Sequence, residues 1–170
     1  IIAQLLKTEI FNNKNIDFKF NIIANNIYNK SDFKSINLNS KIQEGLIDAD
    51  NTKFKWRDIA EFELSESLIY VKNGELVLDG KLKININNSN KLYKFLLTPK
   101  NHRNQIKRVD FNFTYNFDQK IAELKDIKVD DKINNKINKI LNNVVLKRDD
   151  LQNKIYFKNL LNEAIKSYAG

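Results

Sequence analysis

The 170 residues include no cysteine, no methionine, one proline, one histidine and four glycines. The lack of cysteine excludes disulfide bonds and thiolate metal sites. The single His102 excludes a multi-histidine metal site, and the scattered Gly45, Gly74, Gly80 and Gly170 exclude a glycine-rich phosphate loop. No apolar run approaches the roughly 18 residues of a membrane span. From the cysteine, histidine and glycine content we expect no metal and no cofactor.

Positive charge is in excess, with 29 lysines and arginines against 21 aspartates and glutamates, a formal net charge of +8. Asparagine, lysine and isoleucine dominate the composition, as the codons of an AT-rich genome would produce. The net charge is therefore weak evidence for an anionic partner such as nucleic acid.

Alternating apolar and polar residues predict several β-strands. Such alternation covers residues 16–22 and, more weakly, 36–42 and 54–56. Asn73-Gly74 supplies the two positive-φ positions of a tight hairpin turn. The strand that follows spans 76–86 and is longer than usual. Its apolar face carries Leu76, Leu78, Leu82 and Ile84.

A second strong strand is predicted over 111–117. Phe111, Phe113, Tyr115 and Phe117 alternate there with polar residues, so the four rings share one face. Residues 118–120 turn the chain into a partner strand that ends at Val129. The apolar alternation changes parity between residues 124 and 127, which predicts a bulge or bend.

Helical patterns appear in the middle and at the end of the chain. Residues 88–97 read as a cap followed by a short helix that ends before Thr98-Pro99. After residue 131 the period becomes helical, with Ile133, Ile137, Ile140, Leu141 and Val144 on one face. Asp149-Asp150 then caps a last helix, whose apolar stripe is Phe157, Leu160, Leu161, Ala164, Ile165 and Tyr168.

Together these patterns predict a mainly β (α+β) fold: a long antiparallel, curved sheet with a short mid-chain helix and two C-terminal helices. We expect one domain over 1–170, mostly sheet over 1–130 with a helical tail over 131–170. Because the chain begins at Ile1 and has no methionine, we expect it to be the C-terminal fragment of a longer protein.

The polar residues include few candidates for a catalytic site. Glu61 and Glu63 share a strand face, but no apolar residues surround them, so we interpret them as part of a solvated face rather than a glycosidase pair. His102 lies in a basic loop and is interpreted as a surface residue. We expect no enzymatic activity.

The basic loop raises the alternative of single-stranded nucleic-acid binding. Lys100, Arg103, Lys107 and Arg108 precede the aromatic strand, and cations beside stacking rings are typical of such sites. All four rings, however, fall on the face that a core would occupy. We therefore expect no nucleic-acid partner.

The apolar strand faces remain, and two interpretations stay open. They form either a closed core or, in part, a groove for an apolar ligand such as an acyl chain. In the second case the expected lipid-binding residues are Leu76, Leu78, Leu82, Ile84, Phe111, Phe113, Tyr115 and Phe117.

Several segments, in order, resemble the C-terminal region of AsmA-like envelope proteins from AT-rich alphaproteobacteria. They are residues 68–80, 91–95, 101–103, 111–118 and the closing Tyr168-Ala169-Gly170. The resemblance covers about residues 50–170, and it carries no catalytic motif.

The resemblance implies a periplasmic body of β-sheet curled into a hydrophobic groove, with an inner-membrane anchor in the missing N-terminal part. It implies a role in moving phospholipid between the inner and outer membranes or in envelope homeostasis. The function expected from the sequence is thus shielding of phospholipid acyl chains. A purely structural or protein-interaction β domain is the alternative.

Overall fold

The computed structural model describes residues 7, 15, 17–27, 30–44, 46–141, 144–147, 149–150 and 153–169. The strands are β1 (Phe18–Ile27), β2 (Lys30–Gln43), β3 (Leu46–Asp48), β4 (Lys53–Trp56), β5 (Ala60–Lys72), β6 (Glu75–Ile86), β7 (Arg108–Asn116), β8 (Ile121–Val129), β9 (Lys132–Ile133) and β10 (Val145–Lys147). The helices are α2 (Ser89–Leu96), the 3-10 turn η1 (Lys100–His102), α3 (Asn135–Leu141) and α5 (Lys154–Ala169).

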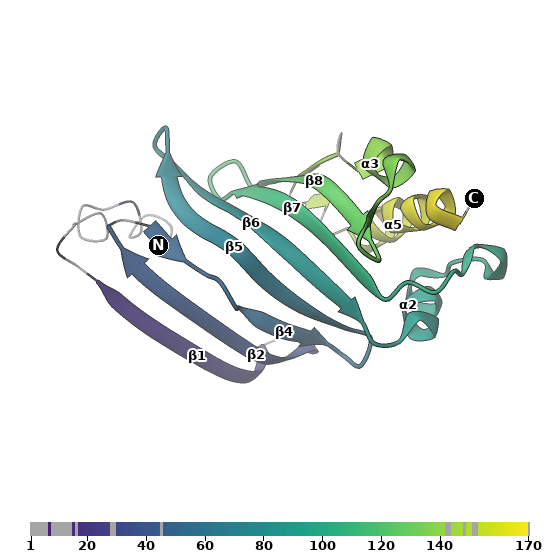
Figure 1. The fold of residues 1–170 in the computed structure, drawn as a ribbon, viewed down its shortest axis with the longest axis horizontal. Helices are drawn as coiled ribbons and strands as arrows, with labels where there is room; N and C mark the ends of the chain where they lie inside the picture. Colours follow the sequence, from purple (N-terminus) through teal and green to yellow (C-terminus); the bar gives the residue numbers. More distant parts are fainter. Residues whose placement is uncertain are drawn as a thin grey trace.

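All ten strands belong to one antiparallel sheet, whose order is β1-β2-β3-β5-β6-β7-β8-β10. The short β4 lies beyond β3, between β2 and β5, and β9 pairs with β8. Figure 1 shows the strands side by side in chain order, twisting from β1 to β8. The mainly β fold with a short mid-chain helix and two C-terminal helices is confirmed.

The predicted hairpin and bulge are both present. Asn73 and Gly74 join β5 to β6 with φ of 52° and 79°. The β7–β8 pairing changes register between Asp110 and Asn112, opposite Asp126, which has a φ of 53°. The bulge lets residues on either side of Asp126 keep their apolar side chains on one side of the sheet.

The pairing register separates an apolar face from a polar face. Leu64 pairs with Leu82, and Leu82 with Phe111, whereas neighbouring Glu63 pairs with Lys83. The apolar face carries Phe20, Ile22, Ile36, Leu38, Phe54, Phe62, Leu64, Ile69, Leu78, Leu82, Ile84, Phe111, Phe113 and Tyr115. The polar face carries Asn21, Asn39, Lys53, Lys55, Glu61, Glu63, Asp79, Lys81, Lys83, Asp110, Asn112 and Thr114.

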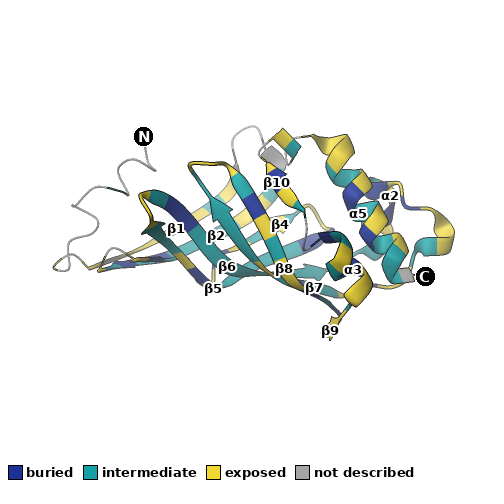
Figure 2. Cartoon of the chain, turned by 90° about the horizontal axis from the view of Figure 1, so that it is seen from above, coloured by how far each residue is buried: buried dark blue, intermediate teal, exposed yellow. Residues whose placement is uncertain are grey.

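The described helices cover one end of the apolar face. Ile137 and Leu141 of α3, with Leu160 and Ala164 of α5, form a buried cluster with Ile127 of β8. Figures 1 and 2 place α3 and α5 at the β7–β10 end of the sheet, with β1 and β2 at the other. The helix-packed cluster of the core therefore lies in the C-terminal half of the sheet, while Ile42 of β2 and Ile47 of β3 are buried in the N-terminal half.

Two predicted details of the tail are wrong. Ile133 and Val144 lie outside α3, because Ile133 belongs to β9 and is 65% exposed, and residues 145–147 form a strand on the edge of β8. The side chain that caps α5 is Asn153, whose Oδ1 accepts hydrogen bonds from the backbone N–H groups of Ile155 and Tyr156. Asp150 instead accepts a hydrogen bond from the backbone N–H of Lys147.

A second bulge, in β5, is held by a carboxylate. The β5–β6 register shifts between Ser65 and Leu68, and Glu66 has a φ of 51°. Asp50 Oδ1 accepts hydrogen bonds from the backbone N–H of Ser67 at 2.6 Å and from its hydroxyl at 2.8 Å. The bulge brings Ser67 against Gly80 of β6, where an added Cβ would stand 2.9 Å from Ser67 Cβ and 3.3 Å from a ring carbon of Phe113.

This close approach predicts that Gly80→Ala destabilises the protein by about 1–3 kcal/mol, the usual cost of overpacking. Urea unfolding measured by circular dichroism checks the change. Lys81→Ala, on the neighbouring polar-face position, is the control and should cost under about 0.5 kcal/mol. Equal stability of Gly80→Ala and the parent chain would contradict the tight contact.

Candidate functional site: an uncovered apolar sheet face

The eight residues expected to bind lipid lie on two neighbouring strands. Leu76, Leu78, Leu82 and Ile84 belong to β6, Phe111, Phe113 and Tyr115 belong to β7, and Phe117 follows directly. Leu78 pairs with Tyr115, and Leu82 with Phe111, so these side chains are neighbours across the strands. The sequence pattern thus grouped residues that the register brings together.

The eight residues do not share one environment. Leu76 is buried, at 2% exposure. Phe111 and Tyr115 pack against the cluster under α3 and α5, so they belong to the core. Leu78, Leu82, Ile84, Phe113 and Phe117 are half-buried and lie outside that cluster. Only this second group borders the uncovered part of the apolar face.

Sequence reasoning missed how far the apolar face continues toward the N-terminus. Phe54 stacks on Phe62 with ring centroids 4.8 Å apart and meets Phe33 edge-on at 5.8 Å. On β1, Phe20 and Ile22 remain 37% and 52% exposed. The alternation of β1 was visible in the sequence, but its register with β6, four strands away, was not. Large apolar side chains facing solvent in a row are unusual for a monomeric sheet.

The α2 end of the apolar face carries an aromatic and cationic rim. Phe95 of α2 meets Trp56 of β4 edge-on at 4.8 Å, and Lys158 Nζ lies 4.2 Å from the Phe95 ring centroid. Arg57 forms an ion pair with Asp32 at 2.9 Å, and that hydrogen bond lowers the pKa of the Asp32 carboxyl. Cations therefore stand where the apolar face ends.

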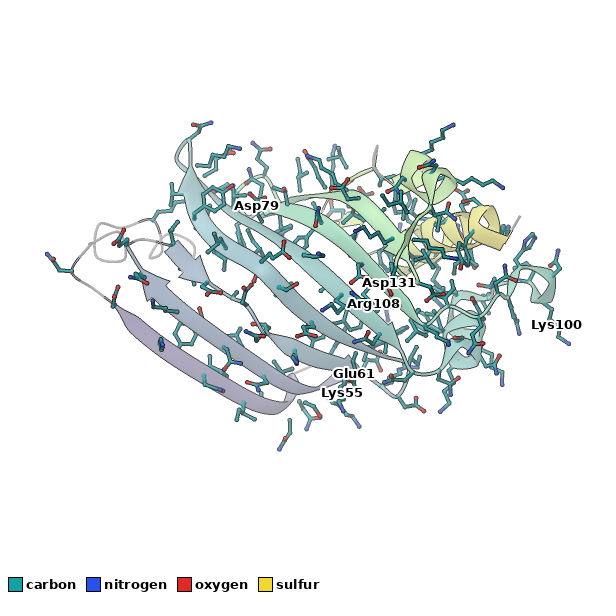
Figure 3. The ribbon with its side chains drawn as sticks, in the orientation of Figure 1. Lys55, Glu61, Asp79, Lys100, Arg108 and Asp131 are labelled. Carbon is teal, nitrogen blue, oxygen red and sulfur yellow. The ribbon has the colours of Figure 1, made fainter. Side chains whose placement is uncertain are left out.

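Ion pairs join neighbouring strands on the polar face. Lys53 pairs with Glu63 at 3.2 Å and Lys55 with Glu61 at 3.0 Å. Figure 3 shows the Lys55–Glu61 pair and, higher on the sheet, Asp79. Both glutamates face lysines across the strands, as on an ordinary solvated strand face.

Two adjoining hollows of about 320 Å³ each open on the polar face. Asp79, Thr114 and Lys125 line both. Asp79 accepts hydrogen bonds from the hydroxyls of Tyr70 and, at 2.6 Å, Thr114. The hydrogen bond to Asp79 raises the pKa of Tyr70. These polar linings do not suit an acyl chain.

The two arginines of the basic loop, Arg103 and Arg108, have partners other than the aromatic rings. Arg108 binds the buried Asp110 at 2.8 Å and Asp131 at 3.3 Å. Figure 3 shows Arg108 beside Asp131. Arg103 donates to the carbonyl oxygen of Thr98. Arg108 and Asp110 lie on the polar face, whereas Phe111 and Phe113 lie on the apolar face. Arg108 therefore lies on the sheet face opposite to these rings.

The described residues contain no group of three or more His, Asp or Glu side chains placed to hold a metal ion. Within the same described part, no helix is long and apolar enough to cross a membrane. Comparison with protein-family models, characterised proteins and solved structures finds no match for the chain. The geometry of the two sheet faces therefore carries the functional argument.

The uneven cover predicts uneven mutational costs along the apolar face. Ile22→Ala should cost under about 1 kcal/mol because the side chain is half in water, whereas Ile127→Ala, at 1% exposure under the helices, should cost about 2–5 kcal/mol. Chemical denaturation of the two variants measures the difference. Similar losses for both would mean that the β1 end is also packed.

Proposed function

We propose that the uncovered part of the apolar face binds the acyl chains of phospholipids and that the protein has no enzymatic activity. The observation that carries the proposal is the band of half-buried and exposed apolar side chains that runs from Ile22 of β1 across β2 and β4 to Phe62 of β5 and Ile84 of β6. The described helices leave this band uncovered. Acyl chains need apolar area rather than specific polar partners.

The cations near α2 fit the same ligand. Arg57 and Lys158 stand beside Phe95, and Lys154 is close enough to Asp32 to help lower its pKa. A phosphate group at this rim would meet positive charge while the chains lie along the apolar face. Burial of acyl-chain and protein apolar surface contributes about 25 cal/mol per Å².

The cellular part of the proposal comes from the resemblance to AsmA-like proteins. We place the domain in the periplasm, tethered to the inner membrane through a part of the protein outside this sequence, where it serves lipid transport or envelope homeostasis. The competing function is a structural or protein-interaction domain. The helix-covered end, where Phe111 and Tyr115 join the core, favours that alternative for its own part of the sheet.

Photo-crosslinking can test lipid contact on one face against the other. Benzoylphenylalanine replaces either Leu38, on the apolar face, or its neighbour Asn39, on the polar face. The purified protein is illuminated with vesicles of phosphatidylethanolamine and phosphatidylglycerol, and adducts are identified by mass spectrometry. We expect lipid adducts at position 38 and several-fold fewer at position 39.

Equal labelling at both positions would indicate non-specific contact and contradict the proposal. No adduct at position 38, together with no phospholipid in extracts of the purified protein above a control protein, would favour the structural domain.

A further inference from the structure

The edge strand β1 has few of the features that usually protect a sheet edge, since its register with β2 shifts only near its end, between Asn26 and Ile27. In the described part of the chain, β1 pairs only with β2. Its ten residues include one charged side chain, Lys19, and no proline. The other end of the sheet is closed by the three-residue β10 beside the helical cluster. Natural sheets blunt exposed edges with short strands, charges, prolines or bulges.

Apolar side chains are exposed on both sides of this edge. Ile22, on the apolar face, is 52% exposed, and the next residue, Ile23, is 75% exposed on the polar face. Ile23 stands there between Asn21 and Asn25, opposite Asn37 of β2. A lipid on the apolar face would not cover Ile23, whereas a strand added to the edge would approach both isoleucines.

We propose that β1 pairs antiparallel with β1 of a second copy of the chain, around a two-fold axis at Ile22. Each pair of opposed residues must have numbers that are both even or both odd, because only then do the two apolar faces lie on the same side of the joined sheet. Two such registers pair nine residues of β1, Ile22 opposite Ile22 and Ile23 opposite Ile23, and the first leaves out Ile27, where the pairing with β2 is irregular. This first register sets Asn21 opposite Ile23 and Lys19 opposite Asn25, so no like charges meet across the strands.

This dimer is independent of the lipid proposal, but it joins the two apolar faces into one surface. Sedimentation velocity at micromolar to millimolar protein tests it. Ile23→Lys introduces a charge at the edge, and Ile155→Lys introduces the same change at a 73% exposed position on α5. We expect dimers for the parent chain and Ile155→Lys, and monomers for Ile23→Lys.

A monomeric parent chain, or equal behaviour of the two variants, would overturn the pairing. The two-fold register is tested by disulfide trapping, which is clean because the chain has no cysteine. Ile22→Cys should form a disulfide-linked dimer under mild oxidation, since opposed strand residues have Cα atoms about 4.5–5.5 Å apart.

Asn25→Cys is the matched control on the same strand. Its two copies would be six residues apart along the pair, roughly 20 Å, which is too far for a disulfide. Trapping at position 25 as efficient as at position 22 would overturn the proposed register.

Discussion

The pairing register between neighbouring strands decides on which side of this sheet every side chain lies. A shift of one residue in any strand would move its apolar residues to the polar face. The bulge in β5 would break this parity with the strands beside it if it stood alone. The interruption between β3 and β4 lies beside the β5 bulge. Asp50, in that interruption, accepts hydrogen bonds from Ser67, in the bulge. The apolar face is continuous because these irregularities are matched.

The second constraint is the small amount of helix available to cover that face. α3 and α5 bury the β7–β10 end, and α2 reaches the rim at Trp56. A sheet of this width presents more apolar surface than these three helices conceal. The polar face needs no cover, because its lysines and glutamates pair across strands such as β4 and β5. The described part of the molecule is therefore two-sided along its width, and the cluster packed by α3 and α5 lies at one end of it.

Local patterns predicted most of the strands and helices, whereas long-range placement escaped them. Asn73-Gly74 and the alternation of 76–86 were sufficient because turn chemistry and period-two burial are local. β10 was missed because three residues carry no readable period. Glu66 has a positive φ without any glycine to signal it. The division of the eight apolar residues into core and uncovered groups depends on where α3 and α5 dock, which no local pattern contains.

The one-sided helix cover also divides the molecule by local stability. β7 and β8 are held by strand pairing and by the buried cluster, whereas β1 and β2 are held largely by pairing and side-chain contacts within the sheet. Amide hydrogens of β1 should therefore exchange through local opening, well below the free energy of global unfolding. A ligand or partner that binds the β1 end should therefore slow amide exchange in β1, because its binding energy opposes the local opening there, and should leave exchange in the core unchanged.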